Sequence, residues 1–228
     1  MKKLIAFFIL SLCPFLFTMK AGAVIPVAVT NPTNTTPNLL AAYASLSLAL
    51  TDLNNVTAMG GPVILTLTGG AAEIAPATGF IIGSATLNPV LSSVNTITII
   101  KGGGGAVTIT AGAGGTGTPA TATQDAILKI VGADWITIDG ITLTDGNAAN
   151  PATMECGIGL FKMSAPDGCQ NNTIKNCIIT LNRINNALAG STASMDGSVG
   201  IEGYNATPSA STTVLTVTAS SGANSNNK

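Results

Sequence analysis

The sequence predicts an all-β fold in which a ribbon of short strands coils and stacks upon itself, with one helix near its start. Three observations support this prediction. Short runs of aliphatic and β-branched residues alternate with polar residues, as in strands with one buried face. Glycine, asparagine and aspartate separate these runs, and no convincing amphipathic helix follows residue 53. Similar segments also recur along the chain, which is typical of repeat architectures.

The first 23 residues have the pattern of a secretory signal peptide. A short basic start precedes an apolar run from Leu4 to Phe17, and an A-x-A cleavage site ends at Ala23. The run is shorter than the roughly 20 residues that a spanning helix needs. A lipoprotein signal at Cys13 is disfavoured by the bulky leucine before it. We therefore expect export to the cell surface or the medium, with no membrane span after cleavage.

Composition excludes several classes of function. Without residues 1–23, six basic residues face ten acidic ones, a net charge of −4, and no run of lysine or arginine occurs. The electrostatic footprint of a nucleic-acid-binding protein is therefore missing. The chain has no histidine, which removes the commonest general base and the usual zinc ligand. Hydrophobic residues make up 46% of the chain and charged residues 8%, so the sequence is not of the disordered class.

The mature chain is predicted to begin with an extended segment and a single helix. Residues 24–37 are rich in proline, threonine and asparagine and are predicted to form an extended leader, and residues 38–228 form the β domain. A helix is predicted over about 39–53, because Tyr43, Leu46, Leu50 and Leu53 recur at spacings of three and four. Asn38 is the expected cap of this helix. Such a helix could cover the open first edge of the stacked ribbon.

The first predicted strand contains Val63, Leu65 and Leu67 at every second position. Further along the chain, two segments match each other at an offset of 36 residues. These segments are Ile136–Thr144 and Asn172–Thr180, and the match places Ile138 on Ile174, Asp139 on Lys175, Gly140 on Asn176, Ile141 on Cys177 and Leu143 on Ile179. Each segment contains a strand, a two-residue polar corner and a second strand. An earlier copy contains Ile97, Ile99, Val107 and Ile109. Asn171, Asn172 and Asn176 suit the corners, because asparagine tolerates left-handed backbone conformations.

A second series of strands is interleaved with the first. Cys156–Phe161 matches Gly197–Glu202, with Ile158 on Val199 and Leu160 on Ile201, and Ala126–Val131 is an earlier member. Thr212–Ala219 is predicted as a further strand. Because one coil cannot bury its own apolar face, the coils are expected to stack around a continuous aliphatic core.

This pattern resembles the right-handed parallel β-helix of the pectate-lyase-like superfamily, and more narrowly the N-terminal β-helix region of large secreted surface proteins of Bacteroidetes. The resemblance is carried by "YASLSLALTDLN", "ILKIVGADWITIDGITLTDG" and "NNTIKNCIITLN". It implies a β-helix with an N-terminal helical cap, and a protein exported by type IX secretion. Such proteins commonly have a C-terminal sorting domain. Because the chain ends soon after the last predicted strand, we expect a fragment of a larger protein.

Gly112, Gly114 and Gly117 fit the dinucleotide fingerprint G-x-G-x-x-G, with Asp139 further on. That site needs a helix directly after the glycines, aimed at a pyrophosphate. Pro119 and alternating threonine and alanine follow instead, without an amphipathic stripe. We interpret the glycines as loop residues and expect no nucleotide or other cofactor.

Enzymes of the superfamily that the chain resembles use clustered carboxylates, with calcium and a basic residue in the lyases. The acids of the later coils do not stack from coil to coil, since Asp139 matches Lys175 and Asp145 matches Leu181. Arg183, the only arginine, has no acidic cluster beside it. No catalytic, cofactor or metal residue is therefore assigned, although Asp139 with Asp145 is a candidate calcium pair. The acids of these coils are Asp134, Asp139, Asp145, Glu155, Asp167, Asp196 and Glu202.

Two aromatic residues and the cysteines leave alternatives open. Trp135 and Tyr204 could each stack on a sugar ring or cover a seam between coils. A Cys156–Cys169 disulfide is geometrically feasible in an oxidising compartment, with Cys177 left over. Together these features predict a structural or adhesive surface segment without a catalytic site, whose partners are extracellular polysaccharide or cell-surface components. The alternative is a part of a polysaccharide lyase or hydrolase whose catalytic residues lie outside this chain.

Overall fold

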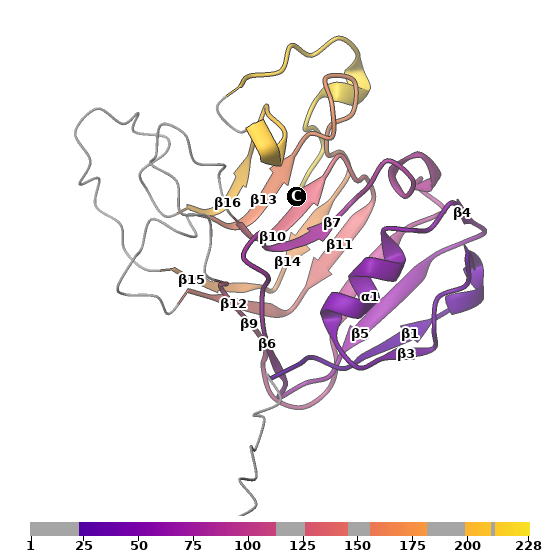
Figure 1. Cartoon of the computed structure of the whole chain (residues 1–228), viewed down its shortest axis with the longest axis vertical. Helices are drawn as coiled ribbons and strands as arrows, with labels where there is room; N and C mark the ends of the chain where they lie inside the picture. The colour runs from indigo at the N-terminus through magenta and orange to yellow at the C-terminus, as the bar shows by residue number, and fades with distance from the viewer. Residues whose placement is uncertain (1–22, 113–125, 146–155, 182–198, 211–212) are drawn as a thin grey trace, which may run out of the picture.

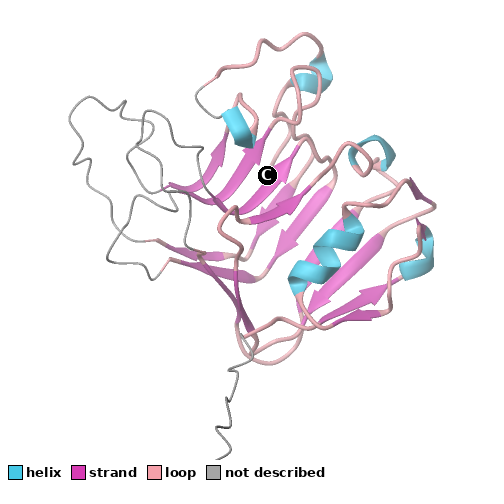
Figure 2. Cartoon of the chain, in the orientation of Figure 1, coloured by secondary structure: helices cyan, strands magenta, loops and turns pink. Residues whose placement is uncertain are grey.

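The computed structural model describes residues 23–112, 126–145, 156–181, 199–210 and 213–228 (Figure 1). Within these ranges the protein is mostly β, with parallel sheets and few helices, as the sequence predicts (Figure 2). No helix in the described ranges is long and apolar enough to cross a membrane. The predicted signal peptide, except for Ala23, lies outside the described residues.

The chain passes through three groups of parallel strands, and it does so in the same order each time. In each group, successive strands pair in parallel, so a strand always lies beside the equivalent strand of the preceding turn of chain. The first sheet contains β5 (Val63–Leu67), β8 (Ile97–Lys101), β11 (Ile136–Asp139) and β14 (Thr173–Lys175). The second sheet contains β6 (Ala72–Ile74), β9 (Val107–Thr110), β12 (Ile141–Thr144) and β15 (Ile178–Thr180). The third sheet contains β7 (Phe80–Ile82), β10 (Ala126–Val131), β13 (Cys156–Phe161) and β16 (Val199–Gly203).

The N-terminal residues extend the first sheet in the antiparallel sense. β1 (Val27–Thr30), within the segment predicted as an extended leader, pairs with β5 and with β3 (Ala42–Tyr43). A separate ribbon joins β2 (Thr35–Thr36) to β4 (Ala58–Met59). Short 3-10 turns lie at Pro32–Asn34, Asn88–Val90, Pro208–Ala210 and Ser220–Gly222.

The single α-helix of the described ranges, α1 (Leu46–Leu53), begins later than the predicted residue 39. Its N-cap is Ser45, whose side chain accepts a hydrogen bond from the Leu48 N–H, so the predicted cap at Asn38 is wrong. The helix starts late because Tyr43 belongs to β3 and pairs with β1. The predicted end at Leu53 is confirmed. Leu46, Leu50 and Leu53 form the buried face, and α1 contacts β7 and β3.

The core consists of aliphatic side chains stacked from strand to strand. The predicted partners Ile138 and Ile174 are directly opposite in β11 and β14, and Leu143 is opposite Ile179 in β12 and β15. Ile138 and Leu143 are each 1% exposed, whereas their partners on β14 and β15 are only partly buried. The predicted inward register of the first and second sheets is thus confirmed.

The predicted register of the third sheet is wrong by two residues. Ile158 lies opposite Ile201, and Cys156 lies opposite Val199. A shift of two residues keeps each side chain on the same face of its strand, so the apolar pattern does not distinguish the two registers. The predicted strand over 212–219 is also wrong for the residues that the structure describes. That segment lacks regular strand pairing and is held by Leu215, whose N–H donates to the Asn205 carbonyl.

A buried carboxylate occupies the inward column of the second sheet. Glu73 lies opposite Ile109 on β9 and is 6% exposed. Its Oε2 accepts hydrogen bonds from the N–H groups of Ile25 and Leu46, both at 2.9 Å, and its Oε1 accepts from Ser47 at 3.1 Å. Glu73 therefore joins the N-terminal segment, the first turn of α1 and the sheet, and it satisfies N–H groups that a helix start leaves without partners.

Candidate functional site

A hollow of about 460 Å³ lies at one side of the first sheet, with Trp135 in its wall. Thr137 on β11 and Thr173 on β14 are opposite each other in the sheet and project outward, because their neighbours Ile136 and Ile138 point into the core. Residues from successive turns of chain therefore contribute to one surface. The lining residues are Thr96, Trp135, Thr137, Asn171, Thr173, Asn226 and Lys228.

Three of these residues occupy equivalent left-handed corners. Trp135, Asn171 and Asn226 have φ values of 59°, 56° and 57°. Asparagine tolerates this conformation, but a bulky residue rarely adopts it. The backbone of Trp135 is fixed from both sides, because its N–H donates to the Gln170 carbonyl and its carbonyl accepts from the Ile97 N–H. Trp135 therefore occupies a left-handed corner that asparagine occupies in the two later turns of the chain, at Asn171 and Asn226.

The residue after each asparagine corner secures the preceding layer through its side-chain amide. Asn172 Oδ1 accepts from the Ile136 N–H at 2.8 Å, and its Nδ2 donates to the Ala133 carbonyl at 2.9 Å. Asn227 repeats this pattern, since its Oδ1 accepts from the Asn172 N–H at 3.0 Å and its Nδ2 donates to the Cys169 carbonyl at 2.9 Å. We call this arrangement the amide clamp. It ties the backbone beside the corners that line the hollow to the preceding layer.

The hollow has the chemistry of a binding site. Its described lining residues are one tryptophan, three threonines, two asparagines and one lysine, and none of them is an aspartate or a glutamate. Trp135 is partly exposed there. Tyr204, the other aromatic candidate, is 7% exposed and stacks on Phe161 with ring centroids 4.3 Å apart. Tyr204 therefore packs within the protein, whereas Trp135 faces the hollow.

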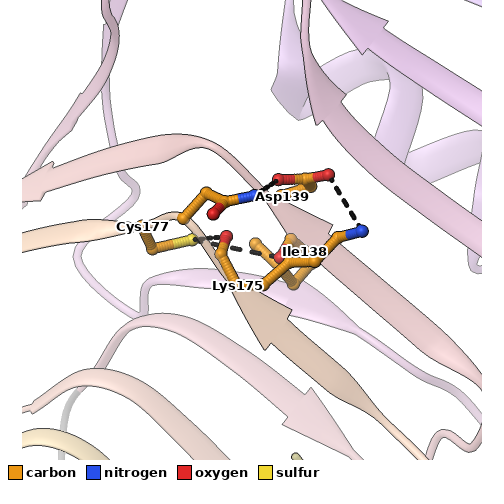
Figure 3. A network of polar contacts seen from close by, with 5 residues as sticks. Ile138, Asp139, Lys175 and Cys177 are labelled. Atoms are coloured by element: carbon orange, nitrogen blue, oxygen red, sulfur yellow. Dashed lines mark hydrogen bonds and ion pairs between the residues drawn. The ribbon is translucent and has the colours of Figure 1, made fainter.

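The corner at Asp139 contains an ion pair with Lys175, the residue that the sequence match places beside it (Figure 3). Lys175 Nζ lies 3.4 Å from Asp139 Oδ2, and Asn176 Nδ2 donates to Asp139 Oδ1 at 2.7 Å. These contacts, the hydrogen bond from Asn176 first, lower the pKa of the Asp139 carboxyl. Asp145 is buried beyond the far end of β12, so the structure does not join Asp139 and Asp145 into a calcium site. In the described ranges no group of three or more His, Cys, Asp or Glu residues could hold a metal ion.

The charge of Asp167 acts on a second acid, Asp134. Burial raises the pKa of Asp134 to about 6, a hydrogen bond from the Gln170 N–H opposes this rise, and the charge of Asp167 adds to it. Burial also raises the pKa of Asp167, which accepts a hydrogen bond from Asn88 Nδ2 at 3.2 Å. The two acids lie 33 positions apart in the sequence, and no local motif indicates this proximity. Glu202 accepts a hydrogen bond from the Tyr204 hydroxyl at 2.8 Å.

The cysteines of the described ranges are free, so the structure does not form a Cys156–Cys169 disulfide. Both thiols are buried, and burial raises the pKa of each to about 12. Cys169 Sγ donates to the carbonyls of Ile130 and Phe161 at 3.2 and 3.1 Å. Since the thiolate is the nucleophilic form, neither thiol is activated. Cys177 is partly exposed, and its Sγ lies 3.3 Å from the Lys175 carbonyl (Figure 3).

Several sequence candidates lie outside the described residues, namely Gly114, Gly117, Glu155, Arg183 and Asp196. Gly112 is described and buried. A Cβ atom there would lie 2.4 Å from the Ala75 carbonyl oxygen, so close packing of neighbouring turns requires glycine at this position.

Comparisons of the chain with protein-family models, curated proteins and solved structures find no match.

Proposed function

We propose that this protein is an exported right-handed parallel β-helix with an N-terminal helical cap, and that it has a structural and adhesive role at the cell surface. Three parallel sheets that the chain visits in a constant order support the coiled architecture. The signal-peptide pattern of residues 1–23 supports export. An elongated stack of turns suits this role, because each turn adds surface without needing a new core.

The adhesive contact that we propose is the Trp135 hollow, and its ligand is a neutral sugar unit of an extracellular polysaccharide. A sugar ring has apolar C–H faces that stack on an aromatic side chain and hydroxyls that bond to polar groups. Trp135 offers the face, while Thr137, Thr173 and Asn171 offer hydroxyl and amide partners. The partly exposed indole in a polar hollow is the observation that carries this proposal.

Intrinsic fluorescence tests the contact directly, because Trp135 is the only tryptophan of the chain. Neutral oligosaccharides should shift or quench the emission in a saturable manner. A Trp135→Ala variant should lose retention on the matching insoluble polysaccharide, and Trp135→Phe should retain part of it. Tyr204→Phe serves as a matched aromatic control that leaves retention unchanged. If no neutral oligosaccharide changes the emission of the folded protein, the proposed contact is wrong.

The second candidate is a segment of a polysaccharide-active β-helix protein whose catalytic residues lie outside this chain. One observation favours it: Asp134, with its pKa raised to about 6, directly precedes Trp135. A carboxyl group whose pKa is raised toward neutral pH is the type that serves as a general acid in glycoside cleavage. Incubating the chain with pectin and alginate, with and without calcium, tests this candidate. Release of unsaturated or reducing ends would favour a polysaccharide-active protein over adhesion, and it would also show that part of the catalytic site lies within this chain.

A further inference from the structure

The outer face of the second sheet is an uncharged grid of mostly threonine side chains. Alternation places Thr108 and Thr110 outward on β9, and Thr142 and Thr144 outward on β12, between buried aliphatic residues. The register aligns these residues in two columns, one through Thr108, Thr142 and Ile178 and one through Thr110, Thr144 and Thr180. On β6 the columns continue with Ala72 and Ile74. Figure 1 shows β6, β9, β12 and β15 side by side along one side of the molecule.

The spacing of this grid follows from strand geometry. Neighbouring strands lie about 4.8 Å apart, and residues two positions apart along a strand are separated by roughly 6.6 Å. Threonine is β-branched, so its χ1 angle is restricted and its hydroxyl and methyl groups have few orientations open to them. The face therefore presents threonine side chains at two regular intervals, one between strands and one along each strand.

The other two sheets lack such a face. In the first sheet, one outward column contains Thr98, Thr137 and Thr173, but the other contains the ion pair of Asp139 and Lys175. In the third sheet, Lys129 and Glu202 occupy the column that passes through Gly159. Charge is thus absent from both columns on the second sheet alone, among the described strands of the three sheets.

The high strand propensity of threonine explains single threonines on a strand surface. It does not explain why these eight positions hold five threonines, two isoleucines and one alanine, with no lysine, glutamate or aspartate. The hydroxyls of Thr108, Thr110, Thr142, Thr144 and Thr180 make no hydrogen bond to another described residue. Ile74 and Ile178 are 63% and 62% exposed at the two ends of the grid. The hydroxyls are therefore free to bond to an external ligand.

We propose that this face binds ice. The ligand is a neutral lattice of water, which matches a face without charge, and prism planes of hexagonal ice repeat their oxygen atoms at intervals close to both spacings of the grid. Threonine methyls favour ordered water beside them, while the hydroxyls join the hydrogen-bond network of that water. The grid spans four strands and two columns, about 14 Å by 7 Å between outermost side chains. An area this small should slow ice recrystallisation and shape crystals, with only a small thermal hysteresis.

The experiment uses the folded chain in ice-recrystallisation and nanolitre-osmometry assays. The wild-type protein should inhibit recrystallisation and shape ice crystals, and Thr142→Lys at the centre of the grid should lose both effects. Thr142→Val, which keeps the methyl groups, should retain part of the inhibition. Thr98→Lys places the same charge outward on β8 of the first sheet and should behave as wild type. Circular dichroism and the unfolding midpoint establish that each variant is folded.

Three results would overturn the proposal. The first is a folded wild-type protein without ice activity. The second is an equal loss of activity in Thr98→Lys and Thr142→Lys. The third is retention on crystalline cellulose or chitin through Thr142 without any effect on ice, which would assign the face to a crystalline polysaccharide. Trp135→Ala separates this proposal from the sugar contact, because it should leave ice activity unchanged.

Discussion

Replacing Glu73 by leucine tests whether a buried carboxylate holds the N-terminal part of the protein to the sheets. The substitution removes the acceptor for the N–H groups of Ile25, Leu46 and Ser47. Ile25 and Leu46 are fully buried, so their N–H groups would be left without partners at about 1–3 kcal/mol each. The favourable charge at the start of α1 adds about 0.3–1 kcal/mol. Ser47 is partly exposed and water can replace its bond.

The free energy of unfolding should therefore fall by about 3–5 kcal/mol in Glu73→Leu, a large share of the roughly 5–15 kcal/mol typical of a folded domain. Glu73→Gln keeps one acceptor oxygen but turns an amide donor toward an N–H group, so it should lose about half as much. Urea denaturation followed by circular dichroism measures both changes. Ile74→Ala on the same strand, where the side chain is 63% exposed, should change stability by less than about 0.5 kcal/mol. Wild-type stability in Glu73→Leu would refute the reasoning.

Three further predictions concern buried groups. Ile138→Asp places an unpaired charge in the core and should unfold or aggregate the protein. Thr137 is the neighbouring residue and its side chain points outward, so Thr137→Asp should remain folded by circular dichroism. Equal tolerance of the two substitutions would contradict the assigned faces. Lys162 is 1% exposed, and its Nζ has no hydrogen-bond partner among the described residues. Lys162→Met should therefore stabilise the fold by about 1–3 kcal/mol in urea titrations, and a loss of stability would count against this account. The pKa of Asp134 is raised in the folded state to about 6, so its contribution to stability is complete below pH 3.8 and is lost as the pH rises to 6. Asp134→Asn keeps an acceptor for the Gln170 N–H. At pH 8 this variant should be more stable than wild type by about 1 kcal/mol after allowance for solvent screening, and at about pH 3.5 the two should be equally stable. The same difference at both pH values would exclude the ionisation of Asp134 as the cause.

The stacking of the first and second sheets could be predicted from the sequence because two signals agree there. The alternation around Ile138 and Ile174 defines the inward face, and the polar corner after each strand fixes the offset between copies. In the third sheet alternation is the sole signal, and alternation does not distinguish registers that differ by two residues. The pairing of Ile158 with Ile201 therefore became clear only in the structure.

The helix start and the polar clusters depend on contacts between distant parts of the chain. Tyr43 fits the helical spacing of Leu46 and Leu50, but pairing with β1 draws it into a strand. Trp135 could be singled out as an aromatic near a strand, whereas its corner conformation follows from bonds to Gln170 and Ile97. No spacing in the sequence indicates such contacts.

The amide clamp has a consequence for how this architecture can vary. The same set of bonds joins Asn172 to Ile136 across 36 positions and Asn227 to Asn172 across 55. Because the clamp closes equally well in both cases, the pitch between layers is independent of how many residues each turn contains. Insertions can then accumulate in the connections between strands, where closing a longer loop costs little entropy. The clamp keeps the spacing between neighbouring strands constant while the connections change in length.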